Sequence, residues 1–308
     1  MTSGAISTTT PLRKRLMPAP RWLVISAPYL WMFLFFFIPF AIVFVISFMK
    51  PVVAMPPVAF EYDLAGNIEL LTKNYNRLFD LDDLLYINAY LGSLKMAAVS
   101  TILALLIGYP VAYAIARAPG ALRQVFLMLV ILPSWTSLLI RIYAWIGLLK
   151  NNGFINNFLM WLGVTDSPIQ MMQTDFAVYI GIVYAYLPFM VLPLYTNLVK
   201  HDPTLLEAAS DLGANRWTAF WKITVPLSKN GIIAGCMLVF IPAVGEFVIP
   251  EILGGPDQLM IGKVLWQEFF NNRDWPVASA VAITMLIMLI APITVFQRIQ
   301  AKELEAGQ

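Results

Sequence analysis

The chain is dominated by long apolar windows, within which apolar and polar residues do not alternate. Six windows of 21 to 28 residues hold at most one charged side chain each. They are residues 22–49, 96–116, 124–149, 176–199, 230–250 and 275–297. Because about 20 apolar helical residues cross a bilayer core, each window predicts one transmembrane helix. A membrane β-barrel would show alternation along each strand, so we expect an all-α membrane protein with six transmembrane helices.

The first window has two interpretations. It follows the basic residues Arg13, Lys14, Arg15 and Arg21, as the apolar part of a secretory signal peptide would. However, its 28 uncharged residues exceed the apolar run of about 7–15 residues in such a peptide. We therefore expect an uncleaved membrane anchor.

Composition supports a membrane protein and excludes several other classes. Charged residues make up 12% of the chain, against about 25% in soluble domains, and hydrophobic residues make up 59%. A single cysteine, Cys236, excludes a disulfide framework, and a single histidine, His201, excludes a Cys/His metal cage. A net charge of +2 is too small to attract nucleic acid. We expect no metal site and no nucleic-acid partner.

Basic residues predict the orientation in the membrane. If both termini lie on one side, that side carries twelve Lys and Arg residues, and the opposite side carries seven in longer loops. Cytoplasmic loops are enriched in Lys and Arg, so both termini are predicted to be cytoplasmic. The segment 50–95 then lies outside and holds six acidic residues. It is either a solvated loop or a docking face for an external partner or a cation.

The predicted cytoplasmic loop between the fourth and fifth windows has helical signals. Asp202 is a good N-cap, and Pro203 suits the first helical position. An apolar stripe at helical spacing follows and ends before Gly213, a natural helix stop. Asn215 can cap a second helix, Arg216 to Lys222, which we expect to end before Pro226. Helices this short are marginal alone, so we expect this loop to dock on a partner or to pack on its own bundle.

The same loop resembles the EAA loop of the membrane subunits of type I ABC importers. The residues that carry the resemblance are Glu207, Ala208, Ala209, Gly213 and Pro226, while Val225 stands where that motif usually has Leu. The resemblance implies a MetI-like permease fold and a coupling helix that sits in a groove of an ATPase subunit. It also implies that Glu207 pairs with a basic group of that ATPase and that Gly213 sets the bend.

The resemblance extends to the permeases of polyamine importers. Residues 132–137, 245–256 and 266–276 are similar to that class, and within it to the putrescine permeases. It implies two ATPase subunits, a second homologous permease and a periplasmic polyamine-binding protein as partners, in the bacterial inner membrane. The implied cargo is putrescine; spermidine or another small solute is the alternative.

The division of the chain follows from the windows and this resemblance. Residues 1–21 are a predicted cytoplasmic tail, 22–49 the first transmembrane helix and 50–85 an outer loop. The predicted permease core is 86–298, with the coupling loop at 200–227, and a second cytoplasmic tail is predicted over 299–308.

No residue pattern predicts catalysis by this chain. Gly262-Lys263 is its only Gly-Lys pair, but Asp257 replaces the first glycine of a phosphate-binding loop, and Val264 replaces its Ser or Thr. We therefore expect no bound cofactor and no catalytic residue, with ATP and Mg²⁺ used by a partner ATPase. A stand-alone secondary transporter and a membrane-embedded enzyme are the competing classes, and the sequence has neither a convincing inverted repeat nor a catalytic cluster.

Two ionisable residues within the windows are candidates for function, because charges in membranes are costly. Glu246 is predicted to line a cation pathway, or else to play a structural role. Arg141 is predicted to be structural, either paired with Glu246 or extended to the interface.

Aromatic rings attract cations, although they also gather at membrane interfaces. The candidates for substrate contact are Trp135, Tyr143, Tyr184 and Tyr186. A further motif, Gly231-x-x-x-Gly235, predicts close helix packing.

Overall fold

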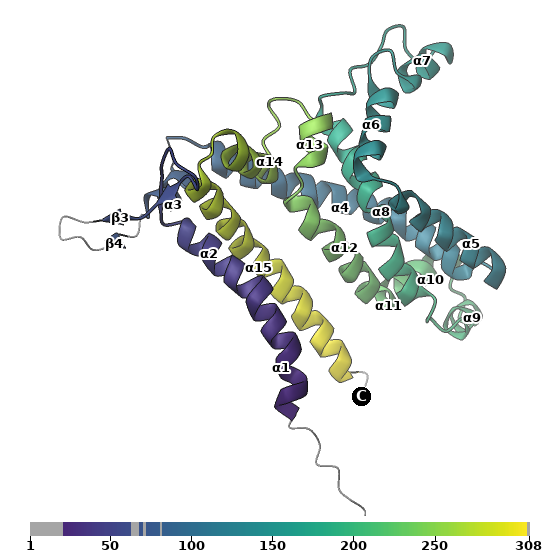
Figure 1. Ribbon diagram of the computed structural model, residues 1–308. Coiled ribbons are helices and arrows are strands. Elements are labelled where there is room, and N and C mark those ends of the chain that lie inside the picture. The colour runs from purple at the N-terminus through teal and green to yellow at the C-terminus, as the bar shows by residue number, and fades with distance from the viewer. Residues whose placement is uncertain (1–20, 63–67, 70–71, 81, 307–308) are drawn as a thin grey trace, which may run out of the picture. The chain divides into compact units, whose positions relative to one another are not determined.

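The computed structural model describes residues 21–62, 68–69, 72–80 and 82–306, which are mostly helical (Figure 1). The predicted tail residues 1–20 and 307–308 lie outside the described residues. The chain divides into two compact units, residues 1–45 and 46–308.

The described part of the first unit, residues 21–45, is a nearly continuous apolar helix. It consists of α1 (Arg21–Met32), the π-helical η1 (Phe33–Phe37) and most of α2 (Ile38–Ile46). Residues Ile25–Ile46 are long and apolar enough to cross a membrane, as the first window predicts. A helix that is apolar all round suits lipid or other apolar surroundings.

Three helices form the centre of the second unit. They are α4 (Leu85–Arg117), α8 (Asp175–Leu198) and α12 (Lys229–Val244), and each packs against the other two. A Cβ atom on Gly231 would lie 2.8 Å from the Asn197 Cβ, and one on Gly235 would lie 2.7 Å from the Met190 sulfur. The glycine motif thus lets α12 approach α8 closely, and the predicted close packing is confirmed.

The last long helix, α15 (Trp275–Ala306), completes the set of unbroken candidate spans. Four helices of the described residues pass the length and hydropathy requirements alone, and six spans result if each of two bent helix pairs crosses the membrane once. The expectation of six spans is therefore met only if both bent pairs cross.

The third predicted window is not one straight helix. It comprises α5 (Gly120–Ile131), the 3₁₀ turn η2 (Leu132–Trp135) and α6 (Leu138–Leu149), and α7 (Phe154–Trp161) follows. The axis turns by 92° between residues 120–135 and 138–161. Pro133 lacks a backbone N–H, and the Ser134 and Thr136 hydroxyls donate to the carbonyls of Ile131 and Pro133 instead. These local bonds replace helical ones at the bend.

The fifth predicted window is also broken. α12 ends at Val244, and a separate short helix, α13 (Val248–Leu253), follows. On the other side, residues 216–227 meet α12 at 65°. This stretch contains α10 (Arg216–Ala219), the π-helical η3 (Phe220–Thr224) and α11 (Val225–Leu227), and it is preceded by α9 (Thr204–Asp211).

The predicted outer loop is partly folded. β1 (Lys50–Pro51) pairs antiparallel with β2 (Val58–Ala59), and β3 (Glu61–Tyr62) pairs with β4 (Ile68–Glu69). α3 (Lys73–Leu78) packs on α4 and α15. The buried Asn74 amide donates to the carbonyls of Ser47 and Met49, each at 2.9 Å. At the same end lie α14 (Ile261–Trp266) and the π-helical η4 (Gln267–Asn271), both packed on the start of α15 (Figure 1).

Candidate functional site

The predicted coupling loop begins with a side-chain cap. The Thr204 amide donates to the Asp202 carboxylate at 3.0 Å. This bond favours the charged form, so it holds the pKa of the Asp202 carboxyl below its ordinary value. α9 itself begins at Thr204, one residue later than the sequence predicts. The predicted capping role of Asp202 is confirmed.

Gly213 ends α9 in a left-handed conformation. Its φ is +82°, which L side chains rarely adopt. The Gly213 amide donates to the Ser210 carbonyl at 2.9 Å, and the Ala214 amide reaches back to the Ala209 carbonyl at 2.9 Å. These two bonds form a Schellman motif, which closes the helix and turns the chain. The geometry gives Gly213 the bend that the resemblance implies.

The second helix of the loop starts as predicted and ends later. The Asn215 side chain accepts a bond from the Thr218 amide at 2.7 Å, so Asn215 is the expected N-cap. The prediction that this helix stops before Pro226 is wrong, because η3 and α11 carry it through Leu227. The π-helical η3 ends at Thr224, two residues before Pro226, and this wider turn accommodates the missing N–H of the proline.

The outer face of α9 has no packing partner among the described residues. Glu207 and Ala208 are exposed, and the Leu212 side chain is 89% exposed, whereas Ala209 is buried. Of the motif, Gly213 and Pro226 are exposed as well. The alternative in which the apolar stripe packs on its own bundle therefore holds only for Ala209. An exposed leucine beside an exposed carboxylate is a surface suited to a protein partner.

An aromatic anchor holds the loop against α4. The Phe220 ring meets Tyr109 and Tyr113 edge-on, with ring centroids 5.6 and 6.0 Å apart. Between this anchor and α9 lies a cleft of about 600 Å³. The cleft is lined by Tyr113, Leu206, Ser210, Arg216, Trp217, Ala219, Phe220 and Thr224. The loop is therefore fixed at one edge and open at the other.

Glu246 lies at the break between α12 and α13, where its carboxylate has three donors. The Tyr186 hydroxyl donates to Oε2 at 2.5 Å, and the Val248 and Ile249 amides donate to Oε1 at 3.0 and 3.4 Å. The residue is only 7% exposed. Glu246 thus ties α8 to the break and caps α13, so both oxygens serve the chain itself. This geometry favours the structural role over direct lining of a pathway.

The proposed pair of Arg141 and Glu246 is not formed, and this prediction is corrected. None of the ion pairs between described residues involves either side chain. The Arg141 guanidinium lies over the Tyr184 ring, 5.9 Å from its centroid. Tyr184 and Tyr186 are two positions apart on α8, which puts them on opposite sides of the helix. Arg141 and Glu246 therefore contact different faces of α8.

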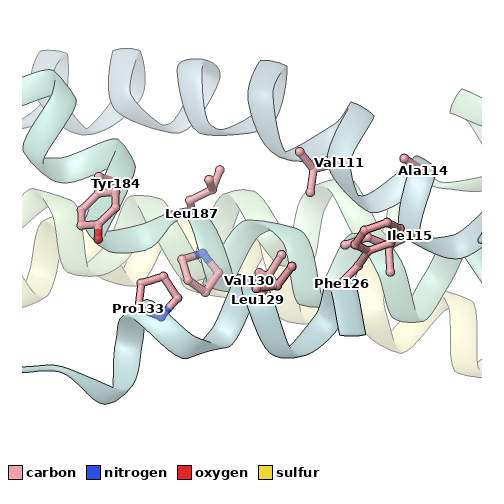
Figure 2. Close-up of a pocket in the computed structure, with 10 residues that line it drawn as sticks. Val111, Ala114, Ile115, Phe126, Leu129, Val130, Pro133, Tyr184 and Leu187 are labelled. Carbon is pink, nitrogen blue, oxygen red and sulfur yellow. The ribbon is translucent and has the colours of Figure 1, made fainter. Parts of the chain in front are cut away.

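The other predicted aromatic candidates do not gather at one place. Tyr184 stands at one end of an apolar cleft of about 410 Å³ between α4, α5 and α8, with Pro133 beside it and Phe126 toward the other end (Figure 2). Trp135 is 74% exposed and Tyr143 is also exposed. Of the predicted pathway residues, the structure joins only Tyr186 with Glu246.

Sequence reasoning missed a second buried carboxylate, Glu268 in η4. The residue is 5% exposed, and it accepts bonds from the Tyr86 hydroxyl at 2.8 Å and from the Asn272 amide at 3.0 Å. Glu268 falls between the apolar windows, in a stretch assigned to an outer loop, so no local pattern marks it as buried.

Comparison with known proteins gives a family match over most of the second unit. Residues 104–305 match the family described as binding-protein-dependent transport system inner membrane component. The spermidine/putrescine transport system permease protein PotB of Escherichia coli K12 is 42% identical over 270 residues, which cover 87% of this chain and 93% of PotB. PotB of Haemophilus influenzae is 43% identical over 226 residues, which cover 73% of this chain and 78% of that protein. These relatives agree with the resemblance to polyamine permeases and do not support its narrowing to putrescine permeases.

Solved structures share the fold at low sequence identity. A chain of a bacterial ABC transporter involved in alginate import aligns with a TM-score of 0.66 at 18% identity, covering 90% of this chain and 96% of that one. A chain of the MetNI methionine transporter aligns with a TM-score of 0.52 at 18% identity, covering 70% and 94%. The predicted MetI-like permease fold is confirmed.

The match of 202 residues and the 42% identity over nearly all of PotB agree with the coupling loop and the apolar helices. The expectation of a transport component rather than an ATPase is confirmed by the same matches. The chain belongs to the family of binding-protein-dependent transport system inner membrane components and is a multi-pass inner membrane permease of the ABC importer type.

Proposed function

We propose that this chain is the permease subunit of an ATP-driven importer that moves polyamines, chiefly putrescine, into the cytoplasm. The observation that carries the proposal is the outward face of α9. There Glu207, Ala208 and Leu212 are exposed, whereas Ala209 of the same helix is buried and the following η3 is anchored to α4 through Phe220. Such a face suits helix-in-groove docking on an ATPase subunit.

The partners follow from this arrangement and from the family. We infer two ATPase subunits, a second homologous permease and a periplasmic polyamine-binding protein, all acting at the lipid bilayer. We infer that ATP and Mg²⁺ bind to the ATPase subunits, and we expect no cofactor and no metal in this chain. A chain of an alginate transporter in complex with its periplasmic protein has the same fold, with a TM-score of 0.69, which is consistent with delivery from outside.

We infer that movement of the coupling loop is transmitted directly to the membrane helices. α10, η3 and α11 lead into α12 across the 65° bend, and α12 ends at the break that holds Glu246. Phe220 ties the same loop to α4 through Tyr109 and Tyr113. When ATP binding draws two coupling loops together, α4 and α12 would be displaced with them, which is how we infer the route opens outward. Hydrolysis would then reset it inward.

The orientation has support from the fold. Tyr113, four residues before Arg117 on α4, lines the same cleft as Leu206 of α9, so the basic α4–α5 turn and the coupling loop lie at one end of the second unit. We infer that this end is cytoplasmic, together with both termini. The opposite end carries Lys95, Asp175, Glu251 and Lys263 in exposed or partly exposed pairs.

The cargo is proposed from the relatives named as spermidine/putrescine permeases. Two buried carboxylates, Glu246 and Glu268, also make the inside of the chain more favourable to cations than to anions. Spermidine carried by the same machinery is the alternative within this class, and a stand-alone secondary transporter is the alternative outside it.

The test measures uptake into proteoliposomes that contain the complex co-purified with the tagged chain. All complexes have their outer side facing the external buffer, with the binding protein outside the vesicles and ATP inside them. We expect ATP-dependent uptake of labelled putrescine, with spermidine as competitor. The Glu207→Ala variant should lose about tenfold or more in uptake, as expected for an interface hot spot.

The control is Asp166→Ala, which removes an exposed carboxylate from the loop after α7. It should leave uptake unchanged. Unchanged uptake in Glu207→Ala would overturn the coupling assignment. Uptake that persists without ATP and without any co-purified ATPase would favour the secondary transporter.

A further inference from the structure

Three aromatic rings from two segments lie against one another beside the break after α12. Phe247 of the break lies against Trp266 at the end of α14, with ring centroids 4.7 Å apart and planes 12° apart. Trp266 lies against Phe270 of η4, with centroids 4.1 Å apart. Trp266 is 39% exposed and Phe270 is 52% exposed, so the stack presents ring surface outward. We call Phe247, Trp266 and Phe270 the aromatic ladder.

The backbone around the ladder fixes it in place. A Cβ atom on Gly262 would lie 2.4 Å from the Gly245 carbonyl oxygen, so α14 rests directly on the break and only glycine fits there. The Ile261 amide donates to the Ser93 hydroxyl at 2.8 Å, which ties the start of α14 to α4. Trp266 and Phe270 share one face of the continuous helix formed by α14 and η4, and tertiary contacts bring Phe247 against that face.

A second pair of rings supports the ladder. Phe269 lies 4.9 Å from Phe270 and stacks on Trp275 at 4.9 Å, so η4 is joined to the start of α15. The π-helical turn of η4 sets the direction of these side chains, and such turns often occur at functional sites. The rings are held at defined positions, as a binding surface requires.

Two buried carboxylates neighbour the ladder in the sequence, and neither forms an ion pair with a basic side chain among the described residues. Glu246 precedes Phe247, and Glu268 lies between Trp266 and Phe270 in the chain. Their hydrogen-bond donors are uncharged hydroxyls and amides. Within the described ranges, the ion pairs near this region join Lys263 to Glu251 and Arg77 to Asp274 instead. Arg273 follows η4 and is exposed.

The ladder thus combines exposed ring surface with the long-range field of two carboxylates that form no ion pair among the described residues. The face of an aromatic ring attracts a cation, and Trp does so most strongly. Buried charges act over longer distances than exposed ones because the surrounding dielectric is low. An apolar partner such as a lipid chain would gain nothing from these charges. A protonated amine on an alkyl chain gains from both the rings and the field.

We propose that the aromatic ladder is a subsite for an ammonium group of the transported polyamine, with the adjacent methylenes lying on the rings. The inference rests on the proposed function, because it takes the cargo to be a polycation. It assigns recognition to the outward ring surface of the ladder, of which Phe270 is the most exposed ring, and it assigns only the long-range field to Glu246 and Glu268.

The test uses the full complex with its binding protein and measures uptake kcat/KM for loaded binding protein. Phe270 is replaced by mono-, di- and trifluorinated phenylalanine, which keep the shape of the ring and progressively weaken its attraction for cations. We expect a stepwise loss that totals about 2- to 30-fold, the range that one cation–π contact provides.

The matched control is the same series at Phe158 of α7, a partly exposed ring stacked on Trp161. It should leave kcat/KM unchanged. If fluorination of Phe270 leaves kcat/KM unchanged in a complex that transports polyamine, the subsite is overturned and the proposed function stands. If Trp266→Leu also releases the second permease during purification, the ladder is a packing face. A wild-type complex that moves no polyamine would refute the proposed function and the subsite with it.

Discussion

The coupling loop and the break at Glu246 differ in whether their polar and apolar side chains are exposed or packed against the rest of the chain. In the loop, Leu212 and Glu207 are exposed, and among the described residues nothing packs over them. At the break, Glu246 is buried and both of its oxygens accept hydrogen bonds from the chain itself. The contrast teaches that a side chain which binds another subunit has no protein partner in the single chain, whereas a side chain which stabilises the fold already has its hydrogen-bond partners.

The largest effect should come from removing the buried anchor. Glu246→Leu leaves the Tyr186 hydroxyl and the Val248 and Ile249 amides without their acceptor. Each unpaired buried donor costs about 1–3 kcal/mol, so we expect a loss of about 3 kcal/mol or more in stability. The measurement is thermal unfolding in detergent. Glu246→Gln keeps one acceptor oxygen and should lose less. Equal stability of the Leu variant and the wild type would contradict the anchor role.

A smaller and purely functional effect is expected at the loop. Leu212→Asp places a charge on an exposed position, so the unfolding temperature should not change. Docking should weaken by about 30-fold if Leu212 is a hot spot worth about 2 kcal/mol. The measurement is retention of the ATPase during purification, together with ATPase activity stimulated by binding protein. Full retention would show that α9 docks through another face.

The bend at Gly213 should give an intermediate effect. Gly213→Ala forces a side chain into the left-handed conformation at φ +82°, at a cost of about 1 kcal/mol. Because no atoms crowd that position, strain is the only local penalty. Gly163→Ala provides the control, since its φ is +69° and its surroundings are equally open. Both variants should lose similar stability, but only Gly213→Ala should lower uptake. Equal uptake in the Gly213→Ala and Gly163→Ala variants would show that the bend at Gly213 plays no part in coupling.

The smallest change in stability is expected at Arg141. Its Nε and Nη1 atoms are buried and have no hydrogen-bond partner within the described part of the chain. Arg141→Met removes these unpaired donors and keeps a long side chain beside Tyr184, so stability should stay within about 1 kcal/mol of the wild type or rise.

Arg123→Met is the contrast to Arg141→Met, because Arg123 donates to the carbonyls of Ala116 and Ala118 at 3.3 and 3.1 Å. It should cost about 1 kcal/mol. The same thermal unfolding measurement serves both variants. A large loss in Arg141→Met would point to a partner of Arg141 supplied by another subunit.

Local signals in the sequence predicted the coupling loop well. Capping by Asp202 and Asn215 and termination at Gly213 involve residues at most five positions apart, so the sequence carries them directly. The end of the second helix was predicted wrongly, because η3 accommodates Pro226 by a change of helix type that Pro226 alone does not signal. The packing of Gly231 and Gly235 on α8 was predictable because small residues repeat at helical spacing.

The sequence predicted which residues form the apolar helices, but it did not predict where those helices bend or break. The apolar windows mark where the chain crosses apolar surroundings, but they do not reveal the 92° turn after Trp135 or the break after Val244. Proline occurs in helices that continue as well as in helices that break: α4 passes through Pro110, and α8 passes through Pro188. Neighbouring helices decide between these outcomes by providing or denying partners for the freed backbone groups.

The sequence by itself determined the class of the protein, the apolar stretches, the coupling motif and the caps that shape it, because hydrophobic burial and capping depend on residues close together in the chain. The tertiary structure decided that Glu246 meets Tyr186 rather than Arg141, that Glu268 is buried, and that Phe247 stacks on Trp266. These contacts join segments up to 182 residues apart, as Tyr86 and Glu268 show. Such contacts depend on how whole helices pack, and no local pattern of residue types specifies that packing.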